Sequence, residues 1–266
     1  MTLLEHTMAS LRTHWPEYGI EALGIATFML SALSFSVLLE HPGSPVHQAV
    51  PAPLARRAVM GAAMAATAMA LVYSPWGKRS GAHFNPALTF TFYRLGKIAG
   101  VDALCYVMAQ FAGALAGVMF AGVLLGGLPA ESSVRFAVTL PGHWGVGPAF
   151  AAELAISVGL MLTVLWASNI PRWNPFTGLF VGALIALYIT VEAPISGMSM
   201  NPARTLGSAA GAHVFDALWI YFTAPALGML VAAELYVRAL GPAGVRCAKL
   251  HHANQERCIF RCAYSE

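Results

Sequence analysis

The sequence predicts an all-α membrane protein with six transmembrane helices and two re-entrant half-helices, built as an inverted repeat of three spans each. Three observations predict this class: a shortage of charge, six long apolar segments, and a motif that occurs twice. Only 10% of the 266 residues are Asp, Glu, Lys or Arg, and 58% are hydrophobic. Soluble domains carry about 25% charged residues. A chain with so little charge cannot cover a globule of this size with polar surface.

Composition also excludes several classes of function. A soluble enzyme, a disordered protein and a nucleic-acid-binding protein all need far more polar residues than this chain has. The formal net charge of +3 is too small to indicate a polyanionic partner. We therefore expect membrane lipid as a partner and no nucleic acid.

A helix that crosses a bilayer needs about 20 predominantly apolar residues. Six segments meet this requirement: Tyr18–Leu39, Arg57–Trp76, Val101–Gly126, Pro148–Ser168, Phe176–Glu192 and Phe215–Leu240. They divide the chain into a tail over residues 1–16, a membrane domain over 17–240 with halves 17–126 and 147–240, and a second tail over 241–266. The first nineteen residues lack an uncharged apolar core and a cleavage site, so we expect them to be retained.

The distribution of Lys and Arg predicts the orientation, because these residues are enriched in cytoplasmic loops. With six spans, both termini lie on one side of the membrane. Eleven of the fifteen Lys and Arg residues fall on that side and three on the other, while Arg204 belongs to neither. We therefore expect a multi-pass protein of the plasma (cell inner) membrane with both termini in the cytoplasm.

The chain contains an internal repeat. The segment SGAHFNPA that begins at Ser80 returns as SGMSMNPA at Ser196, and YVMAQFAG at Tyr106 returns as YFTAPALG at Tyr221. Glu21 in the first span likewise corresponds to Glu153 in the fourth. Because each half has three spans, the second half must lie upside down relative to the first.

A short segment follows the second span of each half, Pro86–Tyr93 and Pro202–Ala210. Each opens with Asn-Pro, and Asn is a preferred N-cap while Pro is favourable at the first helical position. Inverted symmetry brings the two half-helix N-termini together near the midplane, where their positive dipole ends repel cations. This arrangement indicates a pore for small neutral molecules.

The two repeated segments resemble the paired NPA loops of the aquaporin family (major intrinsic proteins), including bacterial-type and plant-like members. They read SGAHFNPALT and SGMSMNPARTLGSA. The match covers roughly residues 17–240. The resemblance implies an aquaporin-like bundle, one pore per subunit, a homotetramer, and passive transport of water and small uncharged solutes with ions and protons excluded. It implies neither enzymatic activity nor a cofactor in the pore.

The resemblance also implies roles for individual residues. Glu21 and Glu153 resemble the buried carboxylates that hold the re-entrant loops. The remaining positions form the NPA boxes, at Asn85, Pro86, Ala87, Asn201, Pro202 and Ala203, and the outer constriction, at Arg204, Ile189, Met198 and either Met64 or Ala65.

The constriction leaves the solute open. Water-selective members have His where this chain has Ile189 and Phe where it has Met64 or Ala65. This favours a facilitator of larger neutral solutes such as glycerol, urea, ammonia or hydrogen peroxide. Thr205 and Ala209, by contrast, resemble the water type. A coupled secondary transporter is the rival class, because it also uses inverted repeats and broken helices.

Three of the four cysteines lie in the last twenty residues. Cys247, His251, Cys258 and Cys262 are soft ligands that could bind Zn²⁺ as a Cys3His site. The thiols could instead form a redox-sensitive disulfide. The third interpretation is a reduced, basic tail close to anionic lipid. His83, two residues before the first NPA box, is expected to be a packing residue at the cytoplasmic mouth rather than a pH sensor.

Overall fold

The computed structural model describes residues 3–264, and within this range it contains helices and no β-strand. Six of these helices are long and apolar enough to cross a membrane. They are α1 (Leu3–Glu40), α3 (Pro53–Tyr73), α6 (Gly100–Leu124), α7 (Val146–Asn169), α8 (Thr177–Val191) and α11 (Leu218–Leu240). The six predicted spans and the all-α class are therefore confirmed.

The shorter helices other than η2 begin where the sequence supplies a cap or a proline. They are α2 (Pro45–Ala49), α4 (Pro75–Ser80), α5 (Pro86–Arg94), α9 (Ala193–Ser196), α10 (Pro202–Ala212), η1 (Leu128–Ala130), η2 (Arg135–Ala137), η3 (Asn174–Phe176) and η4 (Pro242–Gly244). Ser74, for example, caps α4 by accepting a hydrogen bond from the Gly77 N–H at 2.9 Å. Proline follows it at the first helical position, where its missing N–H costs nothing.

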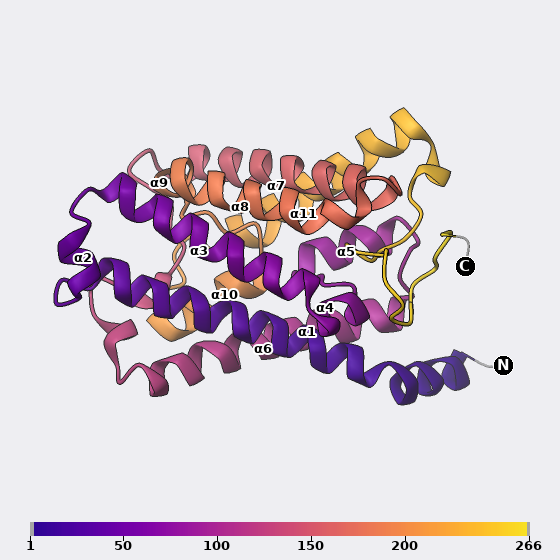
Figure 1. Cartoon of the computed structure of the whole chain (residues 1–266), viewed down its shortest axis with the longest axis horizontal. Helices are drawn as coiled ribbons and strands as arrows, with labels where there is room; N and C mark the ends of the chain where they lie inside the picture. Colours follow the sequence, from indigo (N-terminus) through magenta and orange to yellow (C-terminus); the bar gives the residue numbers. More distant parts are fainter. Residues whose placement is uncertain (1–2, 265–266) are drawn as a thin grey trace.

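The two halves have the same internal arrangement. In the first half α1 packs against α6, and in the second α7 packs against α11. Helices α3 and α8 then pack against each other and join the halves. The half-helices α5 and α10 lie inside this bundle, each in contact with α6 and α11 (Figure 1). Both are thus positioned by helices from the two halves at once.

Both ends of the described chain lie at the same end of the molecule (Figure 1). Helix α1 begins at Leu3, so residues 3–16, expected as a separate tail, continue the first span as helix. Residues 1–2 and 265–266 of the two predicted tails lie outside the described residues. The C-terminal segment after α11 has one turn of helix, η4, and otherwise runs as an irregular strap across the end of the bundle. We call residues 245–264 the tail, and this end of the molecule the tail side.

Candidate pore

Asn85 and Asn201 begin α5 and α10 and link the two half-helices directly. Each side-chain Oδ1 caps its own helix, accepting from Ala87 N–H at 2.9 Å in one case and from Ala203 N–H at 3.0 Å in the other. Each Nδ2 donates across to the opposite loop. Asn85 donates to the carbonyl oxygen of Met200 at 2.7 Å, and Asn201 donates to the carbonyl oxygen of Phe84 at 2.8 Å. The two N-termini therefore meet as a symmetric pair.

Two fully buried glutamates hold the loops that lead into these half-helices. Glu21 of α1 accepts hydrogen bonds from the backbone N–H groups of His83 and Phe84, at 3.1 and 2.6 Å. Glu153 of α7 does the same for Ser199 and Met200, at 2.7 and 2.8 Å. The geometry expected of both glutamates is thus present.

The glutamates compensate for an unusual backbone. The residues with positive φ in these loops occupy equivalent positions in the two halves, Ala82 and Phe84 in one, Met198 and Met200 in the other. L-residues other than Asn and Asp rarely adopt this conformation. The surroundings must therefore impose it. Carboxylate oxygens that accept several backbone N–H groups at once supply strong, charge-assisted bonds for this purpose.

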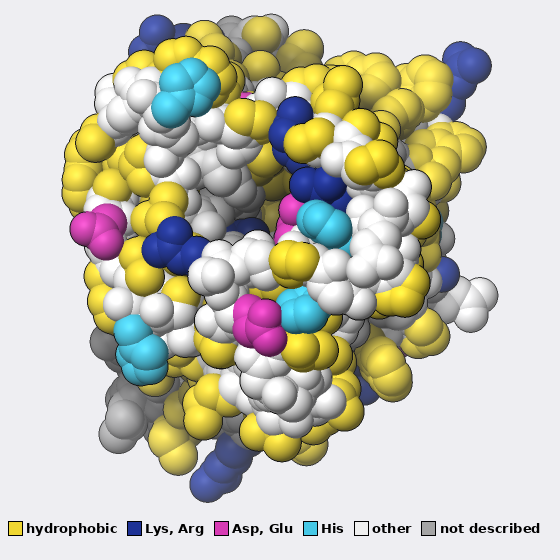
Figure 2. Space-filling model, turned by 90° about the vertical axis from the view of Figure 1, so that its left-hand side faces the viewer, with side chains coloured by type: hydrophobic (Ala, Val, Ile, Leu, Met, Phe, Trp, Pro, Cys, Tyr) yellow, Lys and Arg dark blue, Asp and Glu magenta, His cyan; other side chains and the backbone are white. Residues whose placement is uncertain are grey.

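A cavity of about 330 Å³ runs past both Asn side chains. At one end it reaches Glu40 and Arg57, on the side away from the termini, and at the other it reaches Leu250 in the tail. Most of its walls are apolar. Figure 2 views the molecule from the side away from the termini, where the surface is hollowed and Lys or Arg side chains border the hollow. The cavity therefore follows the long axis of the bundle.

The structure distinguishes the two candidates for the constriction residue on α3. Met64 lines the cavity together with Ile189, Met198 and Arg204, whereas Ala65 does not. Ala65 points elsewhere because consecutive residues of a helix diverge by about 100°. Its carbonyl group lies against α8 instead. Of the two candidates for the constriction, only Met64 therefore lines the cavity.

Arg204 is held in place by a loop between α6 and α7. Its Nη1 donates to the Ala137 carbonyl oxygen of η2 at 2.9 Å. Met60 also lines the cavity, one helical turn before Met64, and was not predicted to do so from the sequence. The i, i+4 spacing of the two methionines was the signal that could have identified it.

The tail covers the other end of the cavity. Leu250, 3% exposed, lines the cavity, and its N–H donates to the Gly81 carbonyl oxygen at 3.2 Å. His83 has one ring nitrogen 2.9 Å from the Ala248 carbonyl oxygen, and its ring stacks between Phe92 and Phe260. This agrees with the packing role expected for His83. No pattern in the sequence indicated that Leu250 would reach the cavity.

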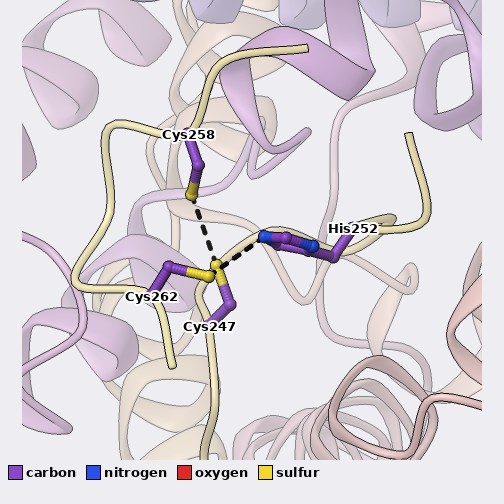
Figure 3. A group of neighbouring side chains, drawn as sticks. All are labelled: Cys247, His252, Cys258 and Cys262. Atoms are coloured by element: carbon purple, nitrogen blue, oxygen red, sulfur yellow. Dashed lines mark hydrogen bonds between the residues drawn. The ribbon is translucent and has the colours of Figure 1, made fainter. Parts of the chain in front are cut away.

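The cysteines of the tail come together, but with a different histidine from the one expected. Cys247, Cys258 and Cys262 gather with His252, and His251 is not part of the group (Figure 3). His251 instead packs edge-on against Tyr73, with ring centroids 5.3 Å apart. The irregular backbone of the tail decides which of two adjacent histidines faces the sulfurs. The hydrogen bond between Cys247 and Cys258 lowers the pKa of the Cys258 thiol and raises the pKa of the Cys247 thiol.

Comparisons with known proteins agree with this architecture. The chain is 35% identical over 201 residues to Aquaporin NIP6-1 of Arabidopsis thaliana, which covers 75% of this chain and 62% of that protein. It is 38% identical over 177 residues to Aquaporin NIP3-1 of Zea mays, covering 66% and 57%. A probable aquaporin of the NIP type from Nicotiana alata is 35% identical over 175 residues, covering 63% and 60%. The chain thus spans about three fifths of the length of the curated relatives it matches.

The X-ray structure of the aquaglyceroporin from Plasmodium falciparum has the same fold, with a TM-score of 0.69 at 22% identity. The likeness covers 87% of this chain and 99% of that one. The family model described as Major intrinsic protein matches residues 12–236, which include both half-helices and nearly the whole of the six spans. The chain therefore belongs to the major intrinsic protein family, the aquaporins.

Proposed function

We propose that the chain is a passive channel for water and other small uncharged solutes that excludes ions and protons. The observation that supports this most directly is the meeting of Asn85 and Asn201 beside a cavity that extends from Glu40 and Arg57 to Leu250. Each Nδ2 carries two hydrogens and donates one of them to a backbone carbonyl oxygen of the opposite loop. The second hydrogen is available to a molecule in the pore. Two fixed hydrogen-bond donors and few charged groups therefore face a permeating solute.

Cations meet an unfavourable potential along this path. Two half-helix N-termini, each equivalent to about half a positive charge, face the same region. Arg204 adds a full charge in the same cavity. The mostly apolar walls offer a cation few ligands that could replace its hydration shell. A small neutral solute loses much less hydration free energy than a cation does when it enters the pore.

Protons are excluded for a related reason. A water molecule whose oxygen accepts from both Asn amides turns both of its own hydrogens away from the midpoint. Neighbouring water molecules on either side then point in opposite directions, so a continuous chain for proton transfer is interrupted. The positive half-helix ends add an electrostatic barrier.

A second candidate function is the facilitated passage of larger neutral solutes such as glycerol, urea, ammonia or hydrogen peroxide. The side chains that support it are Met64, Ile189 and Met198, which line the cavity together with Arg204; none of these four expected constriction residues is aromatic. Methionine is flexible and can fold into or out of a gap. A ring of such side chains can admit a solute wider than water.

Stopped-flow light scattering on proteoliposomes tests both functions, with sucrose and then glycerol as the osmolyte. Faster shrinkage than protein-free vesicles in sucrose is expected of a water channel. Rapid reswelling in glycerol supports the facilitator, and its absence limits the pore to water. No acceleration in either osmolyte overturns both. An Arg204→Val variant, measured at equal protein density with a pH-sensitive dye inside the vesicles, is expected to leak protons where the wild type does not.

The same vesicles separate a channel from a coupled transporter, because a transporter's uptake depends on a pH or ion gradient whereas a channel's does not. We also propose that both termini face the cytoplasm of the plasma membrane and that four copies assemble as a homotetramer. The bias of Lys and Arg towards the tail side supports the orientation. Proteolysis of the tail in sealed, inside-out vesicles and in intact cells tests it.

A further inference from the structure

The tail is buried without a regular scaffold of its own. Residues 245–264 contain no helix or strand. Nevertheless Cys247, Ala248 and Leu250 are at most 3% exposed. Holding an irregular segment in one conformation costs about 1–2 kcal/mol of backbone entropy per residue. Something beyond a few apolar contacts must stabilise this segment.

Two asparagines, at the end of α7 and the start of η3, hold part of the tail in place. The side-chain oxygen of Asn169 accepts the N–H of Arg246 at 2.6 Å, where the tail begins. The Asn174 side chain accepts the N–H groups of His252 and Ala253, at 2.7 and 2.9 Å. These bonds anchor the two ends of one stretch of the tail and set the direction of the side chains between them.

Four side chains of the tail then converge on one point (Figure 3). The Sγ atoms of Cys247 and Cys258 are 3.5 Å apart, and Cys262 Sγ lies 3.0 Å from His252 Nε2. All four ligand atoms lie within 4.8 Å of one another. The four residues are spread over 16 residues of irregular backbone, so their convergence depends on the path of the whole segment.

The size of the cluster fits a tetrahedral metal ion. A Zn–S bond of about 2.3 Å places two sulfurs about 3.8 Å apart across a tetrahedron. The observed separations lie close enough to this value that small rotations of the side chains would complete the shell. Three thiolates and one imidazole are the donor set of a structural Cys3His zinc site, and the soft sulfur ligands disfavour Mg²⁺ and Ca²⁺.

The surroundings of the cluster match the same ion. The backbone N–H of Lys249 donates to Cys247 Sγ at 3.5 Å, as expected for a thiolate. The Lys249 side chain, 1% exposed, interacts electrostatically with all three cysteines. It would offset the net negative charge of Zn²⁺ with three thiolates. The ring of His252 is oriented by stacking on Tyr264, with centroids 4.5 Å apart.

We propose that Cys247, His252, Cys258 and Cys262 bind one Zn²⁺ ion, which fixes the tail across the tail-side end of the cavity. The site is structural, because four protein ligands leave no open position for a substrate. Metal binding would add its free energy to that of the hydrogen bonds that hold the irregular segment. The inference holds whichever solutes pass through the pore.

Metal content tests the site. The full-length chain is purified in detergent with a phosphine reductant, without chelator and without a polyhistidine tag, and its zinc is measured by inductively coupled plasma mass spectrometry. About one zinc per chain is expected for the wild type and for two controls, His251→Ala beside the site and Cys105→Ser outside it. His252→Ala and Cys258→Ser are expected to lose most of it. Equal zinc in all five proteins, or none in the wild type, overturns the proposal.

Cobalt gives a readout that does not depend on the variants folding well. Wild-type protein stripped of metal and titrated with Co²⁺ is expected to show thiolate-to-cobalt charge transfer and the intense d–d bands of tetrahedral coordination. Weak octahedral bands contradict the proposal. A Cys247–Cys258 disulfide in protein purified without reductant also contradicts it and favours a redox role.

Limited trypsin digestion tests whether the ion holds the tail. Lys249 is buried, so cleavage there is expected only after a chelator removes the zinc. Readdition of Zn²⁺ should restore protection. Removal of the metal without any change in cleavage overturns the role in fixing the tail, even if the ion binds.

Discussion

Glu192, just after the end of α8, shows how a single buried carboxyl group can make stability depend on pH. Its side chain is buried, with the residue only 6% exposed. Burial raises the pKa of Glu192 to about 7 from 4.5, and the neighbouring Glu153 carboxylate acts in the same direction. The folded state therefore holds its proton more tightly than the unfolded state does.

The sign of the pH dependence follows from this difference. Below pH 4.5 the group is protonated in both states and contributes nothing, and between 4.5 and about 7 stability falls as pH rises. The loss is at most about 3 kcal/mol. We expect Glu192→Gln to melt at a higher temperature than the wild type at pH 8 and at a similar temperature at pH 4.5, measured by thermal unfolding in detergent. A constant difference across this range would contradict the assignment.

Met64 carries a prediction about solute size. Its side chain lines the cavity, and it is one of the two positions that the resemblance to the family pairs with the Phe of water-selective members. A rigid aromatic ring fills this space, whereas methionine can move aside. We expect Met64→Phe to lower glycerol permeability by at least about tenfold while water permeability changes much less. The same substitution at Ala65, which does not line the cavity, is the matched control. Equal loss of water and glycerol would indicate a blocked or misfolded pore.

Helix pairs within each half depend on glycine at equivalent positions. A Cβ atom on Gly113 of α6 would overlap the carbonyl oxygen of Ala22 in α1, and a Cβ on Gly228 of α11 would lie 2.5 Å from that of Leu154 in α7. Small residues let membrane helices approach this closely. The inverted repeat therefore extends to the packing of the helices and not only to the NPA loops.

This contact predicts opposite effects for two similar substitutions. Gly113→Ala must push α1 and α6 apart, which costs about 1–3 kcal/mol or more. Gly19→Ala, in α1, meets nothing within 4 Å and should stabilise the helix by about 0.5–1 kcal/mol. Melting temperatures of the two variants in the same detergent should therefore move in opposite directions. A Gly113→Ala protein as stable as the wild type would contradict the close packing.

The elements that the sequence predicted well share one physical property, which is a strong local signal. Apolar runs such as that of α6 mark a span by length alone. Asn85 and Asn201, each followed by proline, mark the start of a half-helix within one residue. Met64 and Ala65 could not be separated, because the loop before the first NPA box has an uncertain length relative to the family. The choice depends on the rotation of α3, which packing against α8 decides.

At the scale of the whole molecule, the repeat explains what was predictable and the tail explains what was not. Glu21 and Glu153 could be paired from their equivalent positions, because each half has a re-entrant loop that a buried carboxylate holds in place. The tail has no counterpart in the other half. Its path depends on long-range bonds, such as that of Arg257 with Glu17. No local pattern predicts such contacts. The sequence therefore could not show that His252, and not the adjacent His251, lies with the cysteines.

The tail leads to a prediction for permeation through the whole channel. Leu250 lines the tail-side end of the cavity and is held there by Gly81. Leu250 is only 3% exposed, so we expect a larger side chain to take its extra volume from the cavity. We expect Leu250→Trp to lower water permeability severalfold and Leu250→Ala to leave it equal or higher, in the proteoliposome assay at matched protein density. Leu240→Trp, at the exposed end of α11, should have no effect. If all three variants conduct water as the wild type does, the water path leaves the bundle beside the tail and not past Leu250.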